Sequence, residues 1–447
     1  MTEQEWNTLF GEAAVLMLTD EERRYFALNP LDPTWHTMRF YSKIDESVTR
    51  TTLFFKGDII VKTITETVGR CLGNIHSLNY SESDTRVPTE NRELILPLTA
   101  RGKPKKLSPS ALENINPFGC TFTLEIADRN TTKILLNNFR AARNFPVGEE
   151  KRIAAIRNEA DFHAFTRDYM ESCGTDYFPK LEAFRTAERK TVRYKVGDIF
   201  RMSYDRTHYC YGIIIGEVRR YTQMPELPKL HTLRRQMTVP LLLRAWELVT
   251  ERDDMTADEL AAYPLGRTWL CSDDDILRGN HPLVGHRALR EDDLEFPLLC
   301  VKCLLSNPNI PIREQESFGK MFGTVLSPVY DLYIEWGFAQ TMIPRDKISD
   351  RLRELMNAYP GSGIGVQLGI VPRFLVPEDK LACHHFYREN LHEPHNAEIR
   401  RELFRNLNLP EDCDFDTFAR AFGGLTGAEI LEKIAPPQKT AQPRSKT

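Results

Sequence analysis

Two strand-like runs separated by a short polar loop constrain the fold of this chain more than any other feature. They lie in the sequence YKVGDIFRMSYDRTHYCYGIIIGEV, residues 194–218, on either side of the loop DRTH. Runs rich in isoleucine, tyrosine and phenylalanine between turn residues are typical of β-strands. Because the loop is short, we expect residues 199–204 and 210–218 to pair as an antiparallel hairpin with one buried face. Gly197 is predicted to adopt a bend or a positive φ before the first strand.

The length of the chain predicts more than one domain, because 447 residues exceed a single ordinary domain. We place one boundary near residue 190, where the sequence AFRTAERKTVRY is polar and charged. The predicted class is a multi-domain α+β fold. Its expected parts are an N-terminal α+β region (1–190), a mainly antiparallel β domain (191–310), a C-terminal α+β and mostly helical region (311–434), and a disordered tail (435–447).

Local patterns predict further elements in the flanking regions. Strands are expected where apolar and β-branched residues are dense, at 50–71, 120–128, 329–338 and 364–377. Helices are expected at 146–174, where apolar residues recur at helical spacing, and at 343–363, which has a proline near its start and a glycine at its end. Thr19 and Thr256 are predicted to cap short helices at their N-termini.

The composition favours a globular cytoplasmic protein. Apolar residues make up 41% of the chain and charged residues 27%. The 59 basic residues are nearly balanced by 63 acidic ones, for a net charge of −4, which argues against a dedicated nucleic-acid binder. No signal peptide and no apolar run of about 18 residues is found, so no membrane partner is predicted. The nine scattered cysteines suggest a reducing compartment.

Two clusters of polar residues leave alternative interpretations open. The first cluster is CSDDDILRGNHPLVGH, with Asp273, Asp274, Asp275 and His281. Either these residues bind a hard cation, or the three acids cap a short helix at its positive end. In CHHFYRENLHEPH, the spacing of His392 and His395 permits metal ligation, but Pro394 between them favours histidines around a helix start.

The chain contains no complete catalytic motif: GxSxG, HExxH and the P-loop are all missing. The single CxxC, Cys300 to Cys303, lies in an apolar run and favours a buried strand over a zinc site. We therefore predict no catalytic residue, no cofactor and no bound metal.

The central segment resembles the immunity protein 26 family of bacterial polymorphic toxin systems. The resemblance rests on three features. The first strand starts with Gly-Asp-x-Phe (Gly197, Asp198, Phe200), and the second starts with a Tyr-x-Tyr-Gly motif whose glycine is Gly212. A later strand contains Trp269 and is followed by NHPLVGH. It covers about 100 residues, from Tyr194 to near Phe296. It implies a mainly β protein that binds and neutralises a toxin.

Two functional hypotheses follow from these features. The first is a cytoplasmic, non-enzymatic immunity-type protein that neutralises a cognate bacterial toxin by binding it directly. The hairpin residues expected to contact that toxin are Arg201, Tyr204, Arg206, Tyr209 and Tyr211, because aromatic and arginine side chains dominate protein interfaces. The alternative is a metal-dependent hydrolase or nuclease that uses Asp273–Asp275 and His281.

Overall fold

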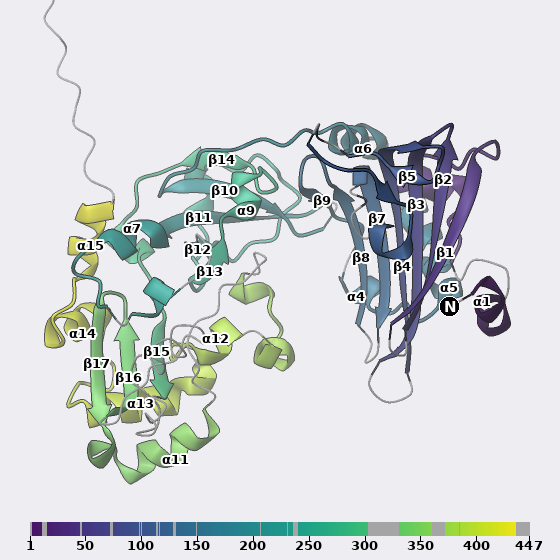
Figure 1. The fold of residues 1–447 in the computed structure, drawn as a ribbon. Helices are drawn as coiled ribbons and strands as arrows, with labels where there is room; N and C mark the ends of the chain where they lie inside the picture. Colours follow the sequence, from purple (N-terminus) through teal and green to yellow (C-terminus); the bar gives the residue numbers. More distant parts are fainter. Residues whose placement is uncertain are drawn as a thin grey trace, which may run out of the picture. The chain divides into compact units, whose positions relative to one another are not determined.

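The fold consists of two compact units, seen in a computed structural model (Figure 1). The first unit comprises residues 1–191, 203–207 and 278–280, and the second comprises residues 192–202, 208–277 and 281–447. Both combine helices with antiparallel sheets, so the predicted α+β class is confirmed. The structure describes residues 2–10, 16–44, 47–71, 75–97, 99, 101–112, 115, 117–127, 131–148, 150–205, 207–229, 231–235, 240–302, 330–359, 372–383 and 385–434.

The first unit is built on a nine-stranded antiparallel sheet. Its main path runs β1-β2-β3-β4-β7-β8-β9, and the short β5 and β6 extend from the end of β4. The strands predicted within 50–71 and 120–128 are confirmed as β2, β3 and β7. The strands are β1 (His36–Ile44), β2 (Ser47–Lys56), β3 (Ile59–Cys71), β4 (Ile75–Glu90), β5 (Leu94–Ile95), β6 (Lys105–Lys106), β7 (Pro117–Ala127), β8 (Thr131–Asn138) and β9 (Arg143–Phe145).

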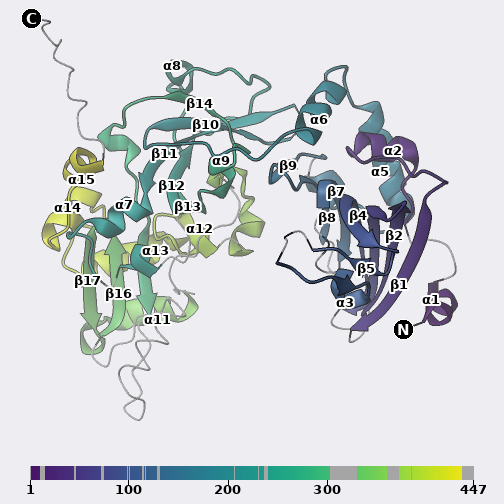
Figure 2. The ribbon, with the colours of Figure 1, turned by 45° about the horizontal axis from the view of Figure 1, so that its top comes forward.

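Helices of the first unit lie beside this sheet (Figure 2), and their side chains form an aromatic core with residues of β7 and β8. Phe26 stacks on Phe122 of β7 at 4.4 Å between ring centroids, and Phe162 lies beside both. Thr19 caps α2 in a capping box with Glu22, as predicted. The helices are α1 (Glu3–Phe10), α2 (Asp20–Tyr25), α3 (Pro109–Leu112), α4 (Glu150–Ile153), α5 (Glu159–Glu171) and α6 (Tyr177–Arg185).

The second unit contains a five-stranded sheet and a three-stranded sheet. The five-stranded order is β13-β12-β11-β10-β14, so β10 and β11 pair as the predicted hairpin. The three-stranded order is β15-β16-β17. The strands are β10 (Asp198–Ser203), β11 (Tyr209–Glu217), β12 (Pro240–Ala245), β13 (Trp269–Ser272), β14 (Leu283–His286), β15 (Leu298–Lys302), β16 (Tyr330–Trp336) and β17 (Ala339–Pro344).

Short helices complete the second unit, and two of them confirm predictions. Thr256 caps α8 as expected, and the helix predicted within 343–363 is α11, capped by Ser349. The helices are α7 (Val218–Gln223), α8 (Ala257–Leu260), α9 (Asp274–Leu277), α11 (Asp350–Ala358), α12 (His385–Glu389), α13 (Ala397–Asn406), α14 (Phe415–Ala421) and α15 (Gly427–Ile434).

One hydrophobic core contacts both sheets of the second unit. It includes Phe200 and Trp269 from the five-stranded sheet, and Trp336 and Phe418 from the C-terminal part. β15 and β16, on either side of the predicted boundary near residue 310, pair with each other. The further division at that boundary stays a prediction.

Part of one predicted strand is wrong. Within the expected strand 364–377, residues 364–371 lie outside the described residues, and Arg373–Leu375 form a 3-10 helix. Pro372 begins that helix with a φ of −57°, which suits a helical start, and a proline cannot donate to a strand ladder. The predicted disordered tail, 435–447, also lies outside the described residues. Within the described part of the chain, no helix has the length and apolar character needed to span a membrane.

Candidate functional site

The Gly-Asp pair at the start of β10 fixes that strand to its neighbour β14. Gly197 has a φ of +90°, as predicted, and a Cβ at this position would lie 2.3 Å from the carbonyl oxygen of Arg287. Asp198 accepts a hydrogen bond from the backbone N–H of Lys195 at 2.9 Å. Its other oxygen lies 2.9 Å from Nδ1 of His286, on β14. Both motif residues therefore have local structural partners.

The remaining motif residues form the interior of the five-stranded sheet. Phe200 is fully buried, and its ring lies directly against the backbone of Gly212 on β11. Trp269 is also fully buried and stands opposite Leu243 of β12. These side chains determine the packing of the sheet and are not available to a partner.

Arg201 and Tyr209 are half-buried residues of the hairpin that contact each other. The guanidinium of Arg201 lies 4.7 Å from the ring centroid of Tyr209, a cation–π contact across the two strands. Arg201 also donates to the backbone oxygen of Asp253 at 2.6 Å and pairs with its carboxylate at 2.9 Å. The backbone of Tyr209 exchanges two hydrogen bonds with Thr250. We call Arg201, Tyr209 and the adjoining segment 248–254 the hairpin surface.

The other predicted contact residues have different surroundings. Tyr204, in the hairpin loop, is 53% exposed. Tyr211 is fully buried, its hydroxyl donates to the backbone oxygen of Arg252 at 2.8 Å, and burial raises its pKa. Arg206 lies outside the described residues. A role for any of the five in binding a partner stays a prediction.

The segment that contains the five-stranded sheet matches one protein family. Residues 195–308 match Immunity protein 26. The match runs from Lys195, just before β10, and includes β15, so it contains the whole five-stranded sheet and the hairpin surface. Searches of the curated proteins and of the solved structures returned no match. The resemblance of the central segment to the Immunity protein 26 family is confirmed.

The aspartates of the Immunity protein 26 segment lie at the start of a helix. Asp274 and Asp275 form the first turn of α9, as the helix interpretation predicts. Asp273 accepts a hydrogen bond from the hydroxyl of Tyr194 at 2.6 Å. His281 lies 3.9 Å from Asp275, and burial lowers its pKa, which favours the neutral imidazole. Across the described residues, no three His, Cys, Asp or Glu side chains are grouped as metal ligands.

The second histidine cluster lies around a helix start. Pro394 begins a 3-10 helix that leads into α13, so His392 precedes the helix and does not share a regular face with His395. The ring of His395 lies 3.1 Å from the backbone oxygen of Arg388. The ring of His392 packs 4.7 Å from Trp336, and burial lowers its pKa to about 4.

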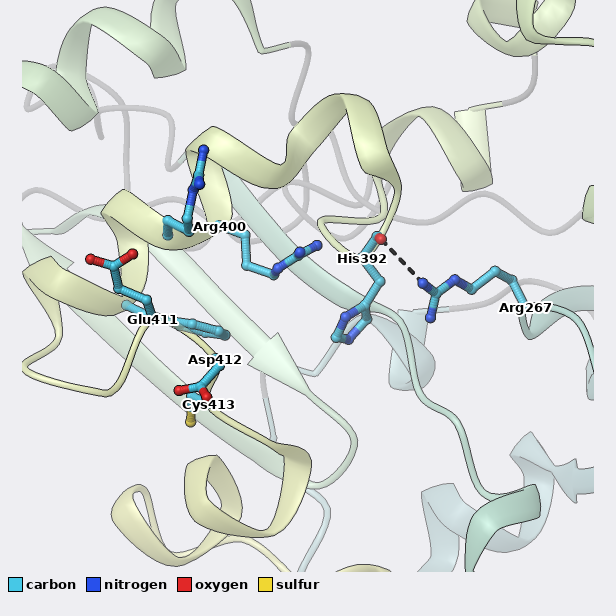
Figure 3. Close-up of a pocket in the computed structure, with 8 residues that line it drawn as sticks. Arg267, His392, Arg400, Glu411, Asp412 and Cys413 are labelled. Atoms are coloured by element: carbon cyan, nitrogen blue, oxygen red, sulfur yellow. Dashed lines mark hydrogen bonds between the residues drawn. The ribbon is translucent and has the colours of Figure 1, made fainter.

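His392 lines a cavity of about 450 Å³ next to α13 (Figure 3). Arg267 donates to the backbone oxygen of His392 at 3.3 Å, and Arg400 donates to that of Leu391 at 2.6 Å. Burial and the neighbouring Arg267 lower the pKa of Arg400. Both arginines hold the chain around His392 in place, and the acids Glu411 and Asp412 line the same cavity.

The buried cysteines are poor nucleophiles. Burial raises the pKa of Cys271 and Cys120 to about 12 and that of Cys413 to about 11, so the thiols stay protonated at neutral pH. Cys300 is buried in β15, while Cys303 lies outside the described residues.

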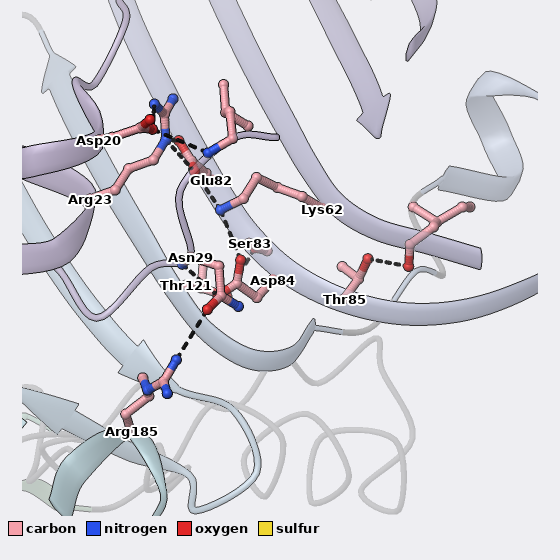
Figure 4. A network of polar contacts seen from close by, with 12 residues as sticks. Asp20, Arg23, Asn29, Lys62, Glu82, Ser83, Asp84, Thr85, Thr121 and Arg185 are labelled. Carbon is pink, nitrogen blue, oxygen red and sulfur yellow. Dashed lines mark hydrogen bonds and ion pairs between the residues drawn. The ribbon is translucent and has the colours of Figure 1, made fainter. Parts of the chain in front are cut away.

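The first unit contains a buried charge network that the sequence analysis missed (Figure 4). Lys62 of β3 is fully buried and lies 2.6 Å from Glu82 and 2.8 Å from Asp84, both on β4. Arg23 of α2 pairs with the same Glu82 at 2.9 Å, and Tyr80 donates to it at 2.7 Å. The sequence contains one signal of this network: Glu82 and Asp84 stand at alternate positions, so in a strand their side chains share one face.

Proposed function

We propose that this protein is an immunity-type protein of the cytoplasm that neutralises a cognate bacterial toxin by binding it. The observation that supports this most is the match of residues 195–308 to Immunity protein 26. A binding role requires a shaped, rigid surface and no catalytic constellation.

The hairpin surface has the properties of such a binding site. Arg201 contacts the ring of Tyr209 and pairs with Asp253. Its side chain is therefore already restrained and loses little conformational entropy when a partner binds. Tyr204 supplies exposed aromatic area, and Tyr209, nearby in sequence, is half-buried. We therefore propose Arg201, Tyr204 and Tyr209 as the main toxin contacts, and Arg206 as a further one. Because Tyr211 is buried, we assign it a role in the core.

The alternative is a hydrolase or nuclease that uses the aspartate stretch. Its three acids have local structural roles: Asp273 accepts from Tyr194, Asp274 accepts from Ser272 at 3.0 Å, and Asp275 stands in the first turn of α9. A metal-dependent site would need these carboxylates to converge on one point. This arrangement favours the binding role over the enzymatic one.

Co-expression with the toxin tests the proposal. The protein should be produced together with the candidate toxin encoded beside its gene, and the two should be separated by size-exclusion chromatography. We expect a stable complex in which the toxin has lost its activity. Separate elution of the two proteins with full toxin activity would contradict the proposal, and loss of toxin activity without complex formation would favour an enzyme.

A further inference from the structure

The first unit has a basic groove of its own, with a volume of about 680 Å³. It runs along the ends of several strands of the nine-stranded sheet. Four of the residues that line it define the groove: Lys56 at the end of β2, Arg86 on β4, Phe118 on β7 and Arg140 after β8. No part of the Immunity protein 26 match contributes to it.

The groove carries positive charge that the protein leaves partly unpaired. Among the described residues, no acid lies within ion-pair distance of Lys56 or Arg86, and both side chains are exposed. Arg140 pairs with Glu188 at 2.7 Å. This concentration of positive charge stands out in a chain whose net charge is −4. The charge favours an acidic ligand.

Exposed apolar side chains lie between these cations. Phe118 is 45% exposed, and the guanidinium carbons of Arg86 and Arg140 lie 5.6 and 5.3 Å from its ring centroid. Ile59, which also lines the groove, is 39% exposed. Aromatic and arginine side chains of this kind are enriched where proteins bind other proteins. The ring also restrains both arginines, which lowers the entropy cost of binding.

One residue that lines the groove, Asp84, belongs to the buried charge network (Figure 4). It pairs with Lys62 at 2.8 Å. Asn29 donates to Asp84 at 2.9 Å, and Arg185 in turn donates to the side-chain oxygen of Asn29 at 3.1 Å. The charge of Asp84 is thus compensated within the protein and does not cancel that of the rim.

We propose that the basic groove is a second recognition surface, which binds an acidic peptide segment that carries an aromatic or aliphatic residue. The acidic groups pair with Lys56 and Arg86, and the apolar side chain packs on Phe118 and Ile59. The proposal is independent of toxin binding by the hairpin, because no residue that lines the groove is among the proposed toxin contacts. It gives the first 190 residues a binding role of their own.

Fluorescence anisotropy with the full chain tests this inference. The probe is a labelled peptide of about ten residues, in which glutamates flank one phenylalanine and one leucine. Competing probes are the same peptide with lysine in place of glutamate, an all-glutamate peptide, and a thymidine oligonucleotide. We expect the first peptide to bind more tightly than all three, and its affinity to fall as salt is added.

Charge reversal locates the site. Arg86→Glu and Lys56→Glu should each weaken binding of the acidic peptide about tenfold or more, and Phe118→Ser should weaken it several-fold. The matched control is Lys133→Glu on β8, an exposed lysine outside the groove, which should change the affinity less than about twofold. Circular dichroism checks that each variant is folded.

Three results would overturn the proposal. The first is no binding of the acidic peptide at millimolar concentration. The second is binding that Arg86→Glu and Lys133→Glu weaken equally, which would indicate unspecific charge attraction. The third is tighter binding of the oligonucleotide than of the peptide, which would assign the groove to nucleic acid.

Discussion

Phe200 occupies the space that a side chain at Gly212 would need. A Cβ placed on Gly212 would lie 2.4 Å from Cζ of Phe200, and 3.0 Å from the backbone oxygen of Arg244 on β12. The ring of Phe200 covers the glycine across the β10–β11 pair, and it is fully buried there. Phe200 and Gly212 thus depend on each other for packing.

We expect Gly212→Ala to destabilise the second unit by roughly 1–3 kcal/mol, because the new methyl group must displace the ring. Chemical denaturation measures the change in the free energy of unfolding. The control is Gly285→Ala in the same sheet, where a Cβ would meet Ile199 at an ordinary 3.7 Å. Equal stability of the two variants would show that the ring is free to move. A double-mutant cycle with Phe200→Leu should reveal coupling between the two positions.

Gly197 combines a positive φ with a close approach, so Gly197→Val should cost roughly 1–3 kcal/mol or more. The matched variant is Gly423→Val, where φ is +70° but nothing lies within 4 Å of a new Cβ. Both variants carry backbone strain, and only the first also meets Arg287. A melting temperature that falls no further for Gly197→Val than for Gly423→Val would contradict the close contact.

Lys62→Met should destabilise the first unit by about 3–5 kcal/mol, because it leaves Glu82 and Asp84 buried without their shared cation. Lys133→Met, at an exposed position in the same unit, should change the free energy of unfolding by less than about 0.5 kcal/mol. Adding Glu82→Gln to Lys62→Met should recover part of the loss. If Lys62→Met alone is as stable as the parent protein, the network contributes nothing to stability.

His392 should make the second unit less stable in mild acid. Burial lowers its pKa to about 4 in the folded protein, against about 6.5 when it is unfolded. The unfolded chain therefore takes up the proton first as the pH falls, and stability is lost between about pH 6.5 and 4. His392→Gln should reduce this loss, while His395→Gln, at an exposed position, should not. Unfolding curves across this range measure the effect, and an unchanged pH dependence for His392→Gln would contradict it.

The elements that could be predicted from the sequence are those whose structure depends on neighbouring residues in the chain. The hairpin follows from alternation and turn residues, and the caps at Thr19 and Thr256 follow from hydroxyls placed before helical segments. β4 was missed because its buried face carries Glu82 and Asp84 instead of apolar residues. Their partners Lys62, Arg23 and Asn29, which come from other segments of the chain, make those charges acceptable inside the protein.

The candidate site was predictable only in part, for a related reason. Tyr209 and Tyr211 are two residues apart, and both were expected to contact the toxin. β11 is a central strand with both faces covered, so only its two end residues, Tyr209 and Glu217, are partly accessible. The basic groove was missed because its side chains come from separate strands. Their proximity depends on sheet pairing that no local pattern contains.

Survival of cells that express the candidate toxin tests the central claim most directly. The protein should protect these cells, and Arg201→Ala or Tyr209→Ala should abolish or strongly reduce protection while the protein remains folded and equally abundant. Asp274→Asn, in the first turn of α9, should protect as well as the parent protein. Loss of protection by a folded Asp274→Asn variant, with full protection by both hairpin variants, would contradict neutralisation by binding and favour an enzyme.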